Sequence, residues 1–101
     1  MGCGYPEGIT GKNIGRQTAL RAGLPLSVAG MVASRFCASG LQSVAIAAGR
    51  IVAEGVPAMV AGGVESISAI RAGNLADIDP WLQERKPDLY MAMIDTADIV
   101  A

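Results

Sequence analysis

Residues 38–54, with the sequence ASGLQSVAIAAGRIVAE, decide the fold because they predict the longest helix of the chain. Apolar residues recur at helical spacing on one face, and further apolar residues lie on the opposite face. The first set is Leu41, Val44, Ala45, Ala48, Ile51 and Val52, and the second is Ile46, Ala47 and Ala53. A helix that is apolar on nearly all sides is expected to be buried on several of them.

The segments on either side of this helix read as buried strands. Residues 24–34, LPLSVAGMVAS, carry a short apolar run, and residues 57–66, PAMVAGGVES, carry a second run that ends in glycines. Short apolar runs bounded by turn residues are typical of buried strands. Strand, helix and strand within about 40 residues have the size of a βαβ unit with parallel strands. The expected fold class is therefore α/β.

The outer parts of the chain have a different character. Residues 2–15 contain five glycines and a proline, which predicts a loop. Residues 13–22, NIGRQTALRA, predict a short helix that Gly23 ends. Residues 69–101 hold most of the charges and the only tryptophan, and they predict a lid or insertion whose last helix is capped by Asp95 or Thr96. We therefore expect an α/β core over residues 1–68 and the start of a lid region over residues 69–101.

Composition excludes several classes of protein. With 101 residues and a formal net charge of -1, the chain offers no electrostatic case for binding nucleic acid or an anionic membrane surface. The first residues lack a signal-peptide pattern, and Gly, Ser and Arg interrupt the apolar stretches before the roughly 18 residues of a membrane-spanning helix. These features favour a cytoplasmic protein. Two distant cysteines and no histidine predict neither a metal site nor a bound cofactor.

Cys37 lies where the first predicted strand meets the long helix. Ligands of open α/β sheets gather at the carboxyl ends of strands, where backbone N–H groups and the helix dipole favour a thiolate. Arg35 is expected to strengthen that effect. The alternative reading is that Cys37 is a small apolar core residue. An α/β-hydrolase elbow is excluded because Arg35 and Ser39 stand where that motif requires glycines.

Four stretches carry a resemblance to a known family. They occur in that family's order and approximate spacing, and they read NIGRQTALRAGLP (13–25), SVAGMVASRFCASGLQSVAIAAGRIVAEG (27–55), AGGVESIS (61–68) and MIDTADIVA (93–101). The chain resembles the N-terminal half of a thiolase, an acetyl-CoA acetyltransferase or 3-ketoacyl-CoA thiolase. The resemblance implies a layered α/β fold, incomplete here, a CoA thioester as substrate, and an acyl-thioester formed on Cys37.

The resemblance also implies what this chain lacks. In thiolases a histidine that activates the nucleophile and a second catalytic cysteine both lie in the C-terminal half, and Cys3 does not match that second cysteine. We therefore expect a partial chain that is inactive alone, needs the C-terminal half, and works within a homo-oligomer, a dimer or tetramer, on acyl-CoA and CoA. Two alternatives remain: a non-catalytic thiolase-like packing or assembly chain, and one half of a split enzyme.

Further residues are expected to shape or support the site. Ser39 and Gly40 allow the helix to begin tightly beside Cys37, and Gly62 and Gly63 end the second strand near the same edge.

The resemblance assigns roles to residues farther from the nucleophile. Met91 and Met93 fall where the family's lid begins to line the acyl pocket, so they are candidates for binding the CoA substrate. Glu65 is expected to support the site, and Arg16 to act as a tether or an interface residue.

Overall fold

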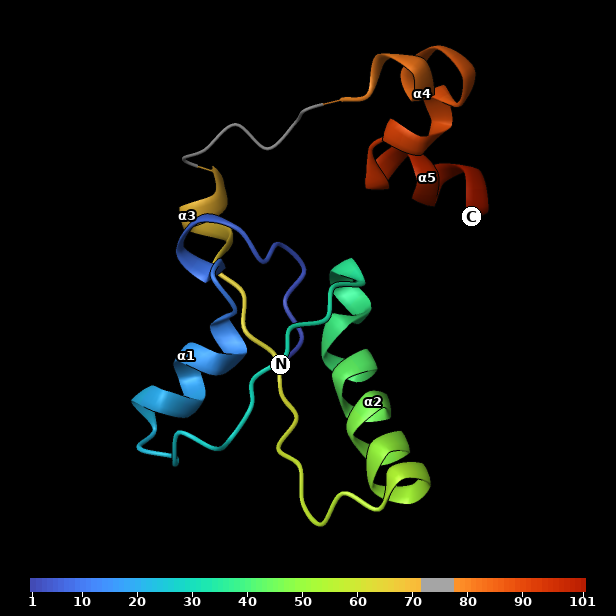
Figure 1. Ribbon diagram of the computed structural model, residues 1–101. Helices are drawn as coiled ribbons and strands as arrows, with labels where there is room; N and C mark the ends of the chain where they lie inside the picture. Colours follow the sequence, from blue (N-terminus) through green and yellow to red (C-terminus); the bar gives the residue numbers. More distant parts are fainter. Residues whose placement is uncertain (72–77) are drawn as a thin grey trace.

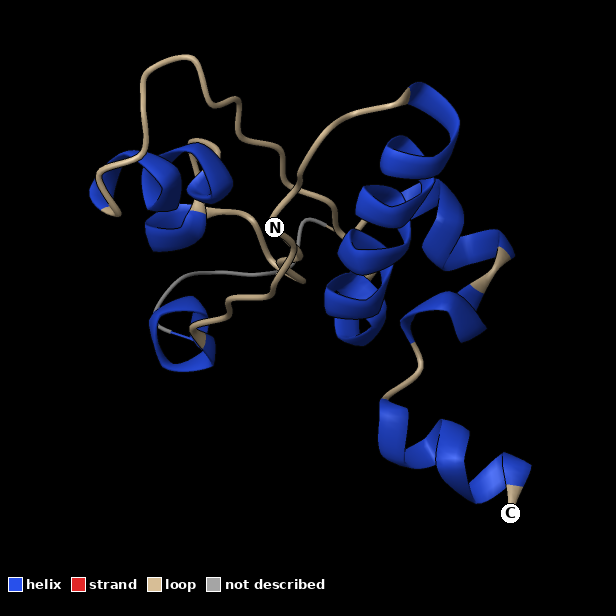
Figure 2. Cartoon of the chain, turned by 90° about the horizontal axis from the view of Figure 1, so that it is seen from below, coloured by secondary structure: helices blue, strands red, loops and turns tan. Residues whose placement is uncertain are grey.

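The computed structural model describes residues 1–71 and 78–101 (Figure 1). Its elements are helices joined by extended and turn segments (Figure 2). In chain order they are η1 (Gly8–Thr10), α1 (Ile14–Arg21), η2 (Phe36–Ala38), α2 (Ser39–Glu54), α3 (Ile67–Arg71), α4 (Pro80–Arg85), η3 (Pro87–Tyr90) and α5 (Met93–Val100), where η marks a 3₁₀-helix. The predicted helices at 13–22 and 38–54 are confirmed to within a residue at each end.

The two predicted strands are extended segments and not regular strands in the described part of the chain. Pairing is limited to two isolated parallel bridges, from Gly2 to Ala33 and from Gly2 to Gly63. The segments before and after α2 therefore both run parallel to the N-terminus, as a βαβ unit would require. Each bridge consists of a single residue pair, however, so the predicted βαβ content is not confirmed.

Residues 1–4, predicted as loop, lie between these two segments and hold them together. Four backbone hydrogen bonds make the connection: Gly2 N–H to Gly62 O (2.7 Å), Val64 N–H to Gly2 O (3.0 Å), Cys3 N–H to Ala33 O (3.1 Å) and Ala33 N–H to Met1 O (3.0 Å). The segment remains irregular, as predicted for residues 2–15, but Gly2 is needed for close packing and not for a turn. A Cβ atom at Gly2 would overlap the backbone carbonyl of Ser39.

Two side chains at the start of α1 bond to the segment that was expected to form the first strand. They belong to the N-cap residue Asn13 and to Arg16. The Asn13 side chain accepts the Arg16 N–H (3.1 Å) and donates to Gly30 O (2.8 Å). The Arg16 guanidinium donates to the carbonyls of Leu26 (2.9 Å) and Val28. Alternate carbonyls of residues 26–30 are thus bonded to side chains and not to a neighbouring strand, which explains the missing ladder and confirms Arg16 as a tether.

Helix α2 buries one narrow row of small residues. Ser39, Ser43 and Ala47 recur every four residues and are buried, whereas Leu41 and Val52 are 77% and 86% exposed. Small side chains let the helix approach closely, and the Ser43 hydroxyl lies 3.0 Å from the Gly62 carbonyl. The prediction that α2 is enclosed on several sides is wrong for the described chain, because only this row is covered.

The segment Phe36–Glu54 forms 19 continuous helical residues of mean hydropathy 1.4. By length and composition alone it is the one described helix that could cross a membrane. The expectation that Gly, Ser and Arg would interrupt such a stretch is therefore wrong, since none of them breaks the helix. Core helices also reach this length and hydropathy, and here Ser39, Ser43 and Ala47 are buried and Ser43 donates to the Gly62 carbonyl.

The C-terminal region contains α4, η3 and α5. The Asp79 carboxylate caps α4 by accepting the N–H groups of Trp81 (2.9 Å) and Leu82 (3.1 Å). Helix α5 begins at Met93 without a side-chain cap, so the predicted cap at Asp95 or Thr96 is wrong. Both residues instead lie inside its first turns. The predicted boundary near residue 69 stays a prediction, and residues 72–77 lie outside the described part.

Little apolar surface is buried within the described residues. Cys3 and Ala47 are the buried apolar side chains there. The radius of gyration of the Cα atoms is 16.8 Å, whereas a compact chain of this length has about 13 Å. Large apolar side chains of α2 are accordingly exposed, Leu41 and Val52 most of all.

Candidate functional site

Cys37 lies on the turn that joins an extended segment to α2. Phe36, directly before it, has a φ of +47°, in the left-handed region that is strained for a bulky side chain. Cys37 is the middle residue of η2, and α2 begins two residues later. Its thiol is free and exposed. The structure therefore places Cys37 at the junction that the sequence predicted.

The Ser39 hydroxyl clamps this turn. Its Oγ accepts the Arg35 N–H (2.8 Å) and donates to the Phe36 carbonyl (2.6 Å), so it spans the residues on the N-terminal side of Cys37. Ser39 is only 3% exposed. The expectation that Ser39 allows a tight start to the helix thus has a specific basis in two hydrogen bonds.

Replacing Ser39 with alanine is expected to lower the free energy of unfolding by about 1–3 kcal/mol, because it leaves the Arg35 N–H without its acceptor. Urea denaturation of the complete protein measures the change. Ser68→Ala is the matched control, because Ser68 is exposed in α3, and its effect is expected to stay within about 0.5 kcal/mol. Equal effects of the two changes would contradict the clamp.

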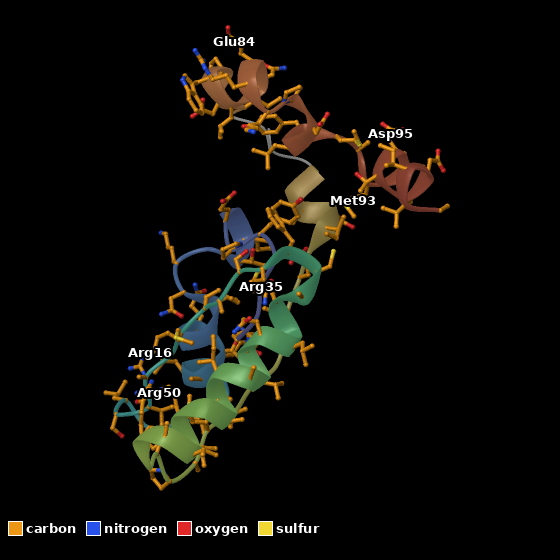
Figure 3. The ribbon with its side chains drawn as sticks, turned by 90° about the vertical axis from the view of Figure 1, so that its right-hand side faces the viewer. Arg16, Arg35, Arg50, Glu84, Met93 and Asp95 are labelled. Atoms are coloured by element: carbon orange, nitrogen blue, oxygen red, sulfur yellow. The ribbon has the colours of Figure 1, made fainter. Side chains whose placement is uncertain are left out.

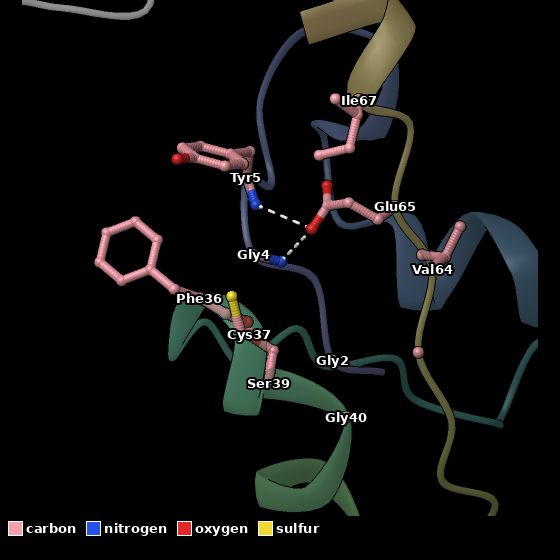
Figure 4. Close-up of a pocket in the computed structure, with 11 residues that line it drawn as sticks. Gly2, Gly4, Tyr5, Phe36, Cys37, Ser39, Gly40, Val64, Glu65 and Ile67 are labelled. Carbon is pink, nitrogen blue, oxygen red and sulfur yellow. Dashed lines mark hydrogen bonds between the residues drawn. The ribbon is translucent and has the colours of Figure 1, made fainter. Parts of the chain in front are cut away.

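Cys37 opens onto a pocket of about 390 Å³ (Figure 4). Three segments line it: residues 2–5, the start of α2, and residues 63–67. Of the predicted site residues, the pocket brings together Cys37, Ser39, Gly40 and Gly63. A Cβ atom at Gly40 would meet nothing within 4 Å, so this glycine leaves open space beside Cys37.

Three predicted site residues do not line the pocket. The Gly62 carbonyl accepts the Gly2 N–H, so Gly62 joins backbone segments beside the pocket. Met91 follows η3, and Met93 begins α5 and is 79% exposed. A role for these methionines in substrate binding stays a prediction.

Arg35 has a different partner from the one expected. Its guanidinium donates to the side-chain oxygen of Gln42 (2.8 Å), and it is not among the described residues that line the pocket. Figure 3 labels Arg35 near the N-terminal end of α2. The structure therefore gives no support to Arg35 as a cation beside the Cys37 sulfur.

The structure adds residues 3–5 to the site and gives Glu65 its partners there. Glu65 Oε2 accepts the N–H groups of Gly4 (2.6 Å) and Tyr5 (3.3 Å), and Oε1 accepts the thiol of Cys3 (3.6 Å). The expected supporting role of Glu65 thus consists of holding the N-terminal segment. A carboxylate two residues after the Gly62–Gly63 pair in an apolar run was the available signal, but its partners are about 60 residues away.

The pocket places one exposed thiol at the start of a 16-residue helix. Thiols at helix N-termini are the usual setting of nucleophilic cysteines. Among the described residues that line the pocket, none is a histidine or lysine that could serve as its base. In the described ranges, no group of three or more His, Cys, Asp or Glu side chains could hold a metal ion. A thiol in this setting could act as a nucleophile only with a base from residues outside the described lining.

Comparisons with known proteins identify the family. Residues 1–97 match the model of the thiolase N-terminal domain. The chain is 39% identical over its whole length to 3-ketoacyl-CoA thiolase of Bacillus subtilis. It is 43% identical over 66% of its length to β-ketoadipyl-CoA thiolase of Acinetobacter baylyi, and 45% identical over 59% to acetyl-CoA acetyltransferase of Cupriavidus necator. The chain belongs to the thiolase family.

These relatives are much longer than the chain. The match spans 26% of the Bacillus protein, 17% of the Acinetobacter protein and 15% of the Cupriavidus protein. The chain thus corresponds to part of an N-terminal thiolase domain.

Proposed function

We propose that Cys37 is the nucleophile of a CoA-dependent acyltransferase of the thiolase type, and that it carries the acyl group as a thioester. The observation that carries this proposal is the exposed Cys37 thiol, which opens onto a pocket at the start of α2. Membership of the thiolase family supports the same reaction class.

The backbone at Cys37 suits the proposed step. Among the described residues, no hydrogen bond from the Cys37 N–H to another backbone group is present. That N–H is therefore available to an oxyanion that forms on the attacked carbonyl, and one such donor contributes about 10²–10³ to the rate. The Ser39 clamp fixes the peptide that carries it.

The proposed step is acyl transfer between two sulfur atoms. The Cys37 thiolate attacks the thioester carbonyl of acyl-CoA, the bond from that carbon to the CoA sulfur breaks, and CoA leaves as a thiol after taking up a proton. The acyl group then passes to CoA or to the carbanion of acetyl-CoA. Transfer to CoA and transfer to the carbanion both need general acid–base groups, each of which typically raises the rate 10²–10⁴-fold.

In our proposal the general acid–base groups lie outside residues 1–101, since this sequence has no histidine. The C-terminal half of the thiolase supplies them and covers α2, and the complete enzyme works as a homo-oligomer, a dimer or tetramer. The relatives' names support CoA thioesters as the substrate class.

Isotope exchange tests the reaction class. In the complete thiolase, labelled CoA is expected to enter acetyl-CoA without any second acyl acceptor, because a covalent acyl-enzyme reverses with whichever CoA is present. The readout is the labelled fraction of acetyl-CoA against time. Exchange that requires a second acyl substrate would contradict a covalent intermediate. Absence of exchange under all conditions would favour a packing or assembly role.

A further inference from the structure

The backbone of Phe36, directly before Cys37, has a conformation that a bulky side chain rarely adopts. Its φ of +47° lies in the left-handed region, which glycine and asparagine favour. Such a conformation persists only where surrounding contacts hold it. Because Cys37 is the next residue, the Phe36 backbone also sets the direction in which the Cys37 N–H and thiol point.

Two contacts hold Phe36 in this conformation. Its carbonyl accepts the Ser39 hydroxyl (2.6 Å), and its ring meets the Tyr5 ring edge to face, with centroids 5.7 Å apart and an angle of 64° between the planes (Figure 4). Aromatic pairs of this geometry stabilise a fold beyond the apolar area that they bury. The Ser39 hydroxyl thus restrains the backbone of Phe36, and the Tyr5 ring restrains its side chain.

The backbone of Tyr5 is held on both sides of its side chain. Its N–H donates to Glu65 Oε2 (3.3 Å), and its carbonyl accepts the hydroxyl of Thr10 (2.6 Å). Thr10 is only 4% exposed. Pro6 follows Tyr5 in the chain and disfavours a helical backbone at Tyr5. The Tyr5 ring therefore extends from an anchored segment, so it can fix the ring of Phe36.

We propose that Tyr5 is a positioning residue for Cys37 and that it acts through Phe36. Its ring holds the Phe36 side chain, which keeps the strained turn in place and fixes the Cys37 N–H and thiol. The role deepens the proposed function and rests on it, because the placement of Cys37 affects turnover only if Cys37 carries the acyl group. The contact is made by the two rings, so the role requires the Tyr5 ring and not its hydroxyl.

Single-turnover acetylation of the complete thiolase by acetyl-CoA tests this role. Tyr5→Ala is expected to lower the acetylation rate of Cys37 at saturating acetyl-CoA about tenfold, because a small displacement of a reacting group has effects of this size or larger. The acetyl-CoA concentration that gives half of the maximal rate is expected to change by less than about twofold, since substrate binding is left intact. Rapid quenching followed by peptide mass analysis gives both values.

Two further variants serve as controls for Tyr5→Ala. Tyr5→Phe keeps the ring and is expected to restore the acetylation rate to within about twofold of the unsubstituted enzyme. Ile9→Ala removes an apolar side chain that is 71% exposed in η1, on the same N-terminal segment, and is expected to leave the rate unchanged.

Phe36→Gly tests the same contact from the other ring. Glycine adopts a positive φ without strain, so this variant is expected to fold, but it has no ring for Tyr5 to hold. Its acetylation rate is expected to fall about tenfold. In this background, Tyr5→Ala is expected to lower the rate by less than about twofold further, because the effects of two residues that act through one contact do not add.

Three results would overturn the positioning role and leave acyl transfer on Cys37 standing. They are a normal rate in Tyr5→Ala or Phe36→Gly, a rate in Tyr5→Phe as low as in Tyr5→Ala, and an undiminished effect of Tyr5→Ala in the Phe36→Gly background. Absence of acetylation on Cys37 in the unsubstituted enzyme would instead overturn the proposed function, and the positioning role with it.

Discussion

Replacing Cys37 with alanine is expected to lower the turnover of the complete thiolase by about 10⁴-fold or more, the size of effect seen when a catalytic nucleophile is removed. The reason is chemical, since alanine has no atom that can form the thioester. Steady-state release of CoA, measured with the substrate in excess, gives the change.

The controls for this change separate chemistry from folding. Because Cys37 is exposed, its substitution is expected to alter the free energy of unfolding by less than about 0.5 kcal/mol. Cys3→Ala is the matched variant, since Cys3 is the only other cysteine and its thiol donates to Glu65. Cys3→Ala is expected to lower the free energy of unfolding. It is expected to leave the rate of acyl transfer in the folded enzyme unchanged. Full activity of Cys37→Ala would place the nucleophile elsewhere.

Gly2→Ala is expected to lower the free energy of unfolding by about 3 kcal/mol, because its Cβ atom would overlap the Ser39 carbonyl. Backbone atoms on both sides of this contact are fixed. Gly2 is bonded to the segments before and after α2, and Ser39 clamps the turn at Cys37. The added methyl group must therefore push α2 away from residues 1–4. Urea denaturation of the complete protein gives the size of the effect.

Gly49→Ala is the matched control for this prediction. Gly49 lies inside α2, and a Cβ atom there would meet nothing within 4 Å. The change is expected to stabilise the protein by about 0.5–1 kcal/mol, because alanine loses less backbone entropy in a helix. A Gly2→Ala protein as stable as the unsubstituted one would show that residues 1–4 do not pack against α2.

The helices near the site were predictable because their signals are local. Gly23 and Gly55 follow α1 and α2, and both adopt positive φ values, +78° and +68°. Asn13 caps α1 through its own side chain. Each of these features depends on residues within a few positions of one another, so the sequence contains them directly.

The extended segments were not predictable in the same way because their partners are distant. The carbonyls of residues 26–30 read as strand backbone, yet Arg16 and Asn13 take them. Glycine-rich residues 1–4 read as loop, although Gly2 makes bridges to both outer segments. Apolar patterning identifies which residues are extended, but it does not identify which groups satisfy their backbone hydrogen bonds.

The candidate site also combines residues that local sequence predicts with residues that only distant contacts bring in. The position of Cys37, with Ser39 and Gly40 after it, follows from one continuous stretch of sequence. The contributions of Tyr5 and Glu65 arise from contacts across about 60 residues, so no local pattern indicates them. The aromatic contact between Tyr5 and Phe36 appears only once the N-terminal segment is placed.

Locating the acyl group in a quenched reaction tests the central claim most directly. The complete thiolase is mixed with acetyl-CoA, stopped in acid before the second transfer, digested and analysed by peptide mass. We predict one acetyl group, bound to Sγ of Cys37 and removable by hydroxylamine. An acetyl group on Cys3 or on a residue outside this chain, with Cys37 unmodified, would contradict the account.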